Sequence, residues 1–198
     1  MDFKKGNFVI MVDNMDRENE GDLMFGAQFA NTEKINFMLT QARGMICLAL
    51  TTRQQRQLEL PFMKSLLHQS SINNAAFTYS VEARNGVTSG ISAKDRARTI
   101  QVAIDQQSCA DDITCPGHIF PIVAVDGGVL ERTGHTEACV DLARISLLNP
   151  AGVLCEILNQ DGEAANHDYL DYFSKKFDIK IGSVEELIKY RRLEKIKI

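Results

Sequence analysis

Residues 16–23, DRENEGDL, place three carboxylates at alternate positions, Glu18, Glu20 and Asp22, shortly after the apolar stretch 8–12. Carboxylates this close together repel one another unless a cation, a proton or a substrate lies among them. The run therefore indicates either a site for metal or acid–base chemistry or a solvated acidic loop. Taken alone, a short acidic run is more often the loop.

A second polar stretch, LERTGHTEA at 130–138, lies where an amphipathic helix is expected to begin. Backbone N–H groups at a helix start, beside Arg132 and Thr136, favour phosphate binding. His135 in the same turn could ligate a metal. The alternative is an ordinary helix N-terminus, capped by Thr133 or Thr136, with His135 in solvent.

The third stretch combines His118, in PGHIFP at 116–121, with Glu156 inside the apolar run AGVLCEIL at 151–158. A carboxylate in so apolar a strand is costly to bury unless it is paired or functional. An arginine partner or a strand edge would explain Glu156 equally well, and a structural histidine would explain His118. The two remaining histidines are predicted to lie on the surface: His68 and His167.

Apolar runs and helical periodicity predict the elements that position these stretches. Strands are expected at 8–12, 23–29, 45–50, 77–83, 118–125 and 151–158, and helices at 32–43, 52–60, 92–105, 136–148, 167–178 and 183–195. Thr32 and Ser92 are the predicted N-caps, and Phe37, Met38 and Phe173 are predicted core residues. Because several strands follow one another without a helix, we predict an α+β fold, with a mixed parallel and antiparallel sheet. The fold is expected to be a single three-layer α/β/α domain over residues 1–198.

Composition narrows the class of protein. The chain has 198 residues, 44% of them hydrophobic, a net charge of −4 and a pI near 5.6, which argues against a nucleic-acid-binding protein but not against a phosphorylated substrate. The five cysteines lack CxxC spacing and predict reduced thiols rather than a zinc site. Signal-peptide and membrane-spanning patterns are absent from the sequence, so we expect a cytoplasmic protein without a membrane partner.

Five stretches in order resemble the 3,4-dihydroxy-2-butanone 4-phosphate synthase family, lyases of riboflavin biosynthesis. They are VDNMDRENEGDL, GVTSGISAKDRARTI, CPGHIFP, GGVLERTGHTEACVDLARISLLNPAGVLCEILNQDG and KIGSVEELIKYRR. The resemblance implies conversion of D-ribulose 5-phosphate to L-3,4-dihydroxy-2-butanone 4-phosphate and formate, through an enediol, loss of water and a skeletal rearrangement. It implies Mg²⁺ as cofactor, with Mn²⁺ as an alternative, and a homodimer with its active site at the interface.

The resemblance also assigns roles to residues. Glu18 and His135 would be the metal ligands, and His118, Glu156 and Glu20 the catalytic residues. The residues expected to bind substrate are Arg17, Glu18, Asp22, Thr88, Arg132, Thr133, Gly134, His135, Thr136 and Glu156. Cys47 lies at a family pocket position, which a buried structural thiol explains equally well.

The chain departs from the family pattern in three places, one of which is that the helix often found before the first strand is absent or very short. Asn14 and Met15 stand where acids are usual, and 163–170 replaces a stretch that commonly contains an arginine. We still expect an active enzyme. The alternatives are a non-catalytic homologue that serves as a dimerisation or regulatory module, and a different metal-assisted sugar-phosphate enzyme such as an isomerase or aldolase. A fused GTP cyclohydrolase II domain is not expected, because the chain ends soon after YRR.

Overall fold

A computed structural model describes residues 2–13, 20–63 and 75–193. The helices of these ranges are α1 (Thr32–Phe37), α2 (Thr52–Gln57), α3 (Ala93–Ile104), α4 (His135–Ile145), α5 (His167–Phe177) and α6 (Val184–Leu193). The strands are β1 (Val9–Val12), β2 (Gly21–Gly26), β3 (Cys47–Thr51), β4 (Val81–Ala83), β5 (Ile113–Ala124), β6 (Gly152–Glu156) and β7 (Lys180–Ser183). Short helical turns lie between them, including η5 (Gly128–Leu130) just before α4.

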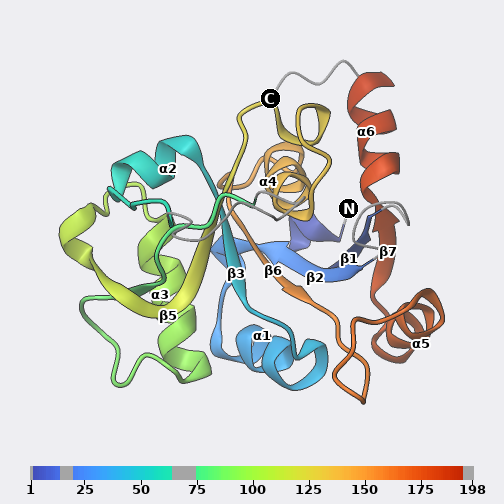
Figure 1. The fold of residues 1–198 in the computed structure, drawn as a ribbon, viewed down its shortest axis with the longest axis horizontal. Coiled ribbons are helices and arrows are strands. Elements are labelled where there is room, and N and C mark those ends of the chain that lie inside the picture. The colour runs from blue at the N-terminus through green and yellow to red at the C-terminus, as the bar shows by residue number, and fades with distance from the viewer. Residues whose placement is uncertain (1, 14–19, 64–74, 194–198) are drawn as a thin grey trace, which may run out of the picture.

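The strands form one mixed sheet in the order β4-β5-β3-β6-β2-β1-β7 (Figure 1). The pairs β3–β5 and β1–β7 are parallel, and the remaining neighbours are antiparallel. This confirms the predicted mixed sheet. β1 and β2 are joined by a short connection, whereas β2 and β6 meet from distant parts of the chain.

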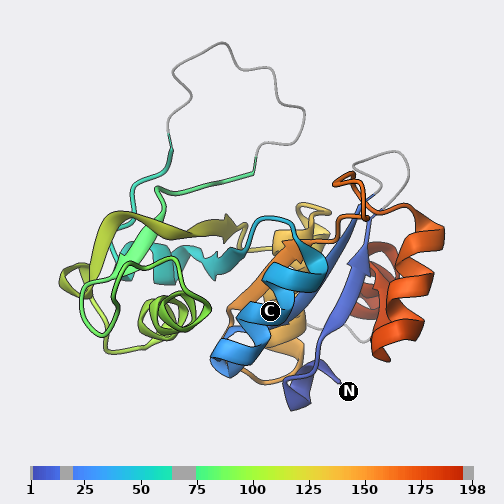
Figure 2. The ribbon, with the colours of Figure 1, turned by 90° about the horizontal axis from the view of Figure 1, so that it is seen from below.

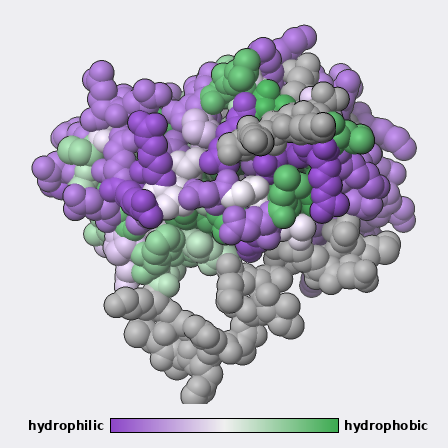
Figure 3. Space-filling view, turned by 90° about the horizontal axis from the view of Figure 1, so that it is seen from above, coloured by the Kyte–Doolittle hydropathy of each residue, from purple (hydrophilic) through white to green (hydrophobic). Residues whose placement is uncertain are grey.

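Helices cover both faces of the sheet (Figure 2). Successive side chains of a strand point to opposite faces, so Leu23 and Phe25 join a core with α1, α3 and α5. Met24, between them, joins the second core, which contains residues of α4 and α6. The predicted three-layer α/β/α arrangement is therefore confirmed. The face drawn in Figure 3 is mainly hydrophilic, and its hydrophobic side chains gather in separate areas.

Helix starts follow the expected capping chemistry, with one correction. The Ser92 hydroxyl accepts the Asp95 N–H at 3.1 Å and caps α3 as predicted. At α1 the cap is Asn31, which accepts the Lys34 N–H at 2.8 Å, and Thr32 is the first helical residue. An Asn and a Thr side by side are both good caps, so the sequence alone did not separate them.

Several predicted boundaries were wrong. The helix expected at 32–43 is α1 followed by a π-helical turn, Met38–Ala42, that ends at Arg43 with φ 74°. The strand expected at 77–83 is regular only in β4, where the pairing register with β5 shifts. β7 was not predicted, because four residues with two small ones carry little strand signal without β1 beside them.

The core predictions agree with the structure. Met38 and Phe173 are buried, and the partly buried Phe37 stacks on Phe8 with ring centroids 5.0 Å apart. Cysteines at 47, 139 and 155 are buried and those at 109 and 115 are exposed, all as thiols. His167 is exposed, as predicted, and His68 lies outside the described residues. None of the described helices is long and apolar enough to cross a membrane.

Candidate active site

A cavity of about 340 Å³ lies where β2 and β6 meet the start of α4. Its walls are formed by Glu20, Asp22, Ala75, Phe77, Ile122, Arg132, His135, Thr136, Leu154 and Glu156. Six of these are predicted site residues: Glu20, Asp22, Arg132, His135, Thr136 and Glu156. The fold thus brings together polar side chains from three distant stretches of the sequence.

The sheet places two carboxylates side by side on the cavity wall. Asp22 on β2 lies directly opposite Glu156 at the end of β6. Their neighbours two positions along, Met24 and Leu154, pack in the core beneath α4, so both carboxylates lie on that face. Directly opposed side chains have Cβ atoms about 5 Å apart, and like charges at that distance repel. The pair therefore favours binding of a cation.

Among the described residues, Glu156 is held by backbone and not by an arginine. One carboxylate oxygen accepts the Met45 N–H at 2.8 Å. Gly44 lies so close that a Cβ there would meet the Glu156 carbonyl oxygen at 2.4 Å and its Oε2 at 2.7 Å. The segment before β3 therefore fixes the orientation of this carboxylate, and only glycine leaves room for it.

His135 is the first residue of α4 and is 6% exposed. Its Nδ1 lies 3.8 Å from Oδ1 of Asp22, which is also buried. The N-cap is Gly134, without a side-chain hydrogen bond, so the alternative of a threonine cap beside a solvated histidine is wrong. Thr136 faces the cavity, whereas Thr133 is exposed and is not among the lining residues.

Arg132 is oriented by a residue that sequence reasoning missed. Its Nη1 donates to Glu137 at 2.6 Å, and the second oxygen of Glu137 accepts the Val125 N–H at 3.2 Å. Glu137 is 1% exposed. A Cβ at Gly134 would lie 2.4 Å from Arg132 Nη1, so glycine lets this side chain cross the helix start. Acids are common in a first helical turn, so nothing in the sequence distinguished Glu137.

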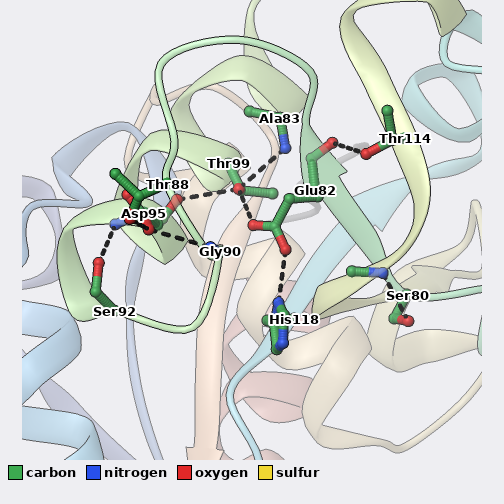
Figure 4. A network of polar contacts seen from close by, with 11 residues as sticks. Ser80, Glu82, Ala83, Thr88, Gly90, Ser92, Asp95, Thr99, Thr114 and His118 are labelled. Carbon is green, nitrogen blue, oxygen red and sulfur yellow. Dashed lines mark hydrogen bonds and ion pairs between the residues drawn. The ribbon is translucent and has the colours of Figure 1, made fainter.

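Besides Thr133, two further predicted site residues, His118 and Thr88, lie away from this cavity wall. His118 on β5 contacts Glu82 on β4, and the Thr88 hydroxyl donates to Asp95 at 2.8 Å (Figure 4). That hydrogen bond is the main cause that lowers the pKa of Asp95. Within the described residues the site is thus divided into two groups, the cavity and the His118–Thr88 cluster.

Some predictions fall on residues that the structure does not describe: Arg17, Glu18, Asn14 and Met15. Across the described ranges, no group of three His, Cys, Asp or Glu side chains converges closely enough to hold a metal ion. Carboxylate oxygens with an imidazole are nevertheless a suitable donor set for Mg²⁺ or Mn²⁺. A cation beside His135 would need a further ligand, which the sequence offers at Glu18.

Cys47 lies next to this region on β3 and is 2% exposed. Burial raises the pKa of its thiol far above the ordinary value, and the nearby Glu156 carboxylate acts in the same direction. A thiol of this kind stays protonated and packs as a small apolar group. Its place in the core accounts for Cys47 without a chemical role.

Known proteins of one family resemble this chain over most of its length. The family model for 3,4-dihydroxy-2-butanone 4-phosphate synthase matches residues 1–190. A synthase of that name from Haemophilus influenzae strain PittEE is 46% identical over 189 residues, 96% of this chain and 87% of the relative. The riboflavin biosynthesis protein RibBA of a Synechocystis strain is 51% identical over 192 residues, 96% of this chain and 34% of the relative. Several curated relatives are longer proteins, and this chain spans only about half of their length or less.

Solved structures show the same fold. A 3,4-dihydroxy-2-butanone 4-phosphate synthase in complex with two magnesium ions has a TM-score of 0.87 and 35% sequence identity, over 97% of this chain and 94% of that one. The family model covers the residues that line the cavity and those of the His118–Thr88 cluster. The chain therefore belongs to the 3,4-dihydroxy-2-butanone 4-phosphate synthase family of enzymes.

Proposed function

We propose that the chain converts D-ribulose 5-phosphate to L-3,4-dihydroxy-2-butanone 4-phosphate and formate, as a lyase of riboflavin biosynthesis. The observation that carries this proposal is the single cavity that unites Glu20, Asp22, Arg132, His135, Thr136 and Glu156. Substrate and products balance in atoms without an oxidant or reductant, since the water lost in one step is taken up in another. The chemistry therefore needs phosphate recognition, carbonyl polarisation and repeated proton transfer, and these residues supply such groups.

The phosphate is recognised at the start of α4. Arg132 keeps donors besides the Nη1 that contacts Glu137, because a guanidinium carries five N–H groups. The backbone N–H groups of His135 and Thr136 lie in the first turn of this 11-residue helix and add favourable partial charge. Charge-assisted contacts of this kind hold the phosphate and leave the carbonyl end of the sugar near the carboxylates.

Proton transfer falls to the carboxylates on the opposite wall. Glu156 and Glu20 line the cavity, and the Met45 N–H holds Glu156 in one orientation. Enediol formation requires a base next to the substrate carbon and an acid next to its oxygen. Asp22, opposed to Glu156 across the sheet, orients the sugar hydroxyls between the two side chains.

The metal of this reaction would be held by His135 together with Glu18. Mg²⁺, or Mn²⁺ in its place, would polarise the substrate carbonyl and stabilise the enediolate. The support from this chain is the buried imidazole at the cavity wall and the carboxylates around it. A structure neighbour of the same family name is in complex with two magnesium ions.

We propose a homodimer in which each cavity is completed by the partner subunit. His118 and Thr88 are predicted site residues but do not line the cavity of their own chain. Large hydrophobic side chains remain exposed beside it: Phe62 at 45%, Met63 at 43% and Tyr79 at 47%. A buried dimer interface would cover these side chains. The assignment of residues 1–198 as one catalytic domain and the cytoplasmic location stay predictions from the sequence.

Subunit complementation tests the composite site. His118→Ala and His135→Ala each remove one half of it, so each variant alone should be nearly inactive. The two variants are mixed in equal amounts, unfolded and refolded together. Half of the dimers should then contain one chain of each variant, and each such mixed dimer should have one intact site. About a quarter of the wild-type sites would then return. No recovery in a mixture shown to contain mixed dimers would contradict a shared site.

Formate release tests the reaction itself, and His167 offers a matched control. His135→Ala should abolish formate release from ribulose 5-phosphate, whereas His167→Ala, at an exposed position on α5, should leave it unchanged. An isomerase or aldolase would consume the substrate without formate. A non-catalytic homologue would bind it without turnover. Full formate release by His135→Ala would remove this residue from the site.

A further inference from the structure

We propose that Glu82 is a positioning residue that fixes His118 for proton transfer. The inference deepens the proposed function and rests on it, because His118 is assigned there to the site. The two side chains come from neighbouring strands, β4 and β5, and His118 points toward Glu82 (Figure 4). Nδ1 of His118 lies 2.6 Å from Oε2 of Glu82.

The two partners differ in exposure in a way that suits this role. The His118 side chain is 41% exposed, whereas that of Glu82 is 12% exposed. One edge of the imidazole thus contacts a largely buried carboxylate, and part of the ring remains accessible. A substrate can reach the imidazole only from the side away from Glu82.

Two residues besides His118, Thr99 and Gly90, lie close to the Glu82 carboxylate and restrict it. Oγ1 of the buried Thr99, on α3, lies 3.1 Å from Oε1 of Glu82 and also accepts the Ala83 N–H at 3.1 Å. Gly90, with φ 83°, approaches so closely that a Cβ there would meet Oε2 of Glu82 at 2.0 Å. The loop before α3 therefore closes over the carboxylate and leaves it one orientation.

This geometry selects one tautomer of the imidazole. An ionised carboxylate can only accept hydrogen bonds, so Nδ1 of His118 carries the proton. Nε2 then presents its lone pair on the accessible side of the ring. A histidine oriented by a carboxylate in this way can remove a proton at Nε2 without first changing its tautomer or rotating.

A purely structural ion pair explains the arrangement less well. A pair with one partner 41% exposed contributes little to folding stability, because water screens the attraction. Enclosing the Glu82 carboxylate between Thr99 and Gly90 nevertheless requires special residues on two elements. The contact that this enclosure secures is the one to His118.

Glu82→Met tests the proposal, because methionine keeps the length of the side chain and removes the acceptor. We expect kcat for formate release to fall about 10- to 100-fold while KM stays within about twofold, as for loss of an orienting partner. Glu163→Met, at an exposed position outside both groups, is the matched control and should behave as wild type. Glu82→Gln keeps an oxygen acceptor, so its kcat should lie between that of Glu82→Met and that of wild type.

The double variant separates positioning from a structural role. If Glu82 acts through His118, adding Glu82→Met to His118→Ala should cause no further loss of kcat. A further loss as large as in the wild-type background would overturn the proposal. Nitrogen-15 spectra of the imidazole provide a readout independent of activity: the Nδ1–H tautomer should dominate in wild type and give way in Glu82→Met.

The outcomes also distinguish this proposal from the proposed function. If wild type releases no formate, the proposed function fails, and the imidazole spectra alone then decide whether Glu82 fixes His118. If wild type is active and Glu82→Met keeps more than half of its kcat with an unchanged tautomer, the proposal is wrong while the function stands. A folded Glu82→Gln with intermediate kcat supports it even where Glu82→Met does not fold.

Discussion

Replacing Arg191 by methionine should destabilise the protein strongly, because it breaks a buried ion pair that ties α6 to the segment before α4. Arg191 Nη1 lies 2.7 Å from Oδ2 of Asp141 and 2.8 Å from the Gly127 carbonyl oxygen. The same Asp141 oxygen accepts the Val129 N–H at 2.9 Å. The segment held in this way leads directly to Arg132.

The size of the effect follows from burial. The Arg191 and Asp141 side chains are 4% and 0% exposed. Removing one partner of a buried pair typically costs about 3–5 kcal/mol, since the remaining charge is left in a low-dielectric interior. Arg144 remains 3.8 Å from Asp141, and the Val129 N–H remains as a donor. We therefore expect the free energy of unfolding to fall by about 3 kcal/mol, the lower end of this range.

The loss of stability in Arg191→Met should increase as the pH rises. Burial raises the pKa of Asp141 above its ordinary value, while the Val129 N–H and Arg191 oppose the shift. Without Arg191 the pKa rises further, so the folded variant binds a proton that the unfolded chain releases above about pH 4. Stability of the variant then falls, relative to wild type, as pH rises from about 4 toward neutrality. The deficit should be larger at pH 7 than at pH 5.

Equilibrium urea unfolding at a fixed protein concentration measures this deficit, because oligomerisation would otherwise change the apparent stability. Lys189→Met is the matched control on the same helix: its pair with Glu185 is 2.7 Å long but lies in solvent, so no measurable change is expected. Asp141→Asn should recover part of the loss in the Arg191→Met background. A loss below about 1 kcal/mol at pH 7, or equal losses at pH 5 and pH 7, would refute the reasoning.

Three further predictions concern the site and the cysteines. Gly44→Ala should lower kcat at least about tenfold, measured by formate release, because its Cβ would displace Glu156. Arg132→Ala should raise the KM for ribulose 5-phosphate about tenfold through loss of a charge-assisted phosphate contact, and an unchanged KM would contradict that role. Iodoacetamide at pH 8 should label exposed Cys109 in the native protein and spare Cys47, whose pKa burial raises, as peptide mass spectrometry would show.

The sequence alone predicted the parts of the fold that depend on local patterns. Apolar runs marked β1, β3 and β6, and capping chemistry marked the start of α3. Adjacent strands without intervening helices predicted the mixed sheet, which the strand order confirms. These features need only neighbouring residues to specify them.

Features that depend on distant contacts were missed. β7 exists because it pairs with β1, which lies far away in the sequence. Glu82 and Glu137 are ordinary acids in sequence and become significant only beside His118 and Arg132. Periodicity and composition carry no information about such pairings, which the packed fold creates.

The family resemblance predicted more of the site than the residue types could. It named Asp22 and Glu156 together, and the register of β2 and β6 places them opposite each other. It also named His118 and Thr88, which lie in the separate cluster. That division supports the proposal of a site shared between subunits, which the family resemblance had already implied.

Formate release from D-ribulose 5-phosphate by the purified wild-type chain tests the central claim most directly. With Mg²⁺ present, the account predicts formate and L-3,4-dihydroxy-2-butanone 4-phosphate in equal amounts. Excess EDTA should stop the reaction, and added Mg²⁺ should restore it. A folded protein that releases no formate with Mg²⁺, or releases it equally well in excess EDTA, would contradict the account.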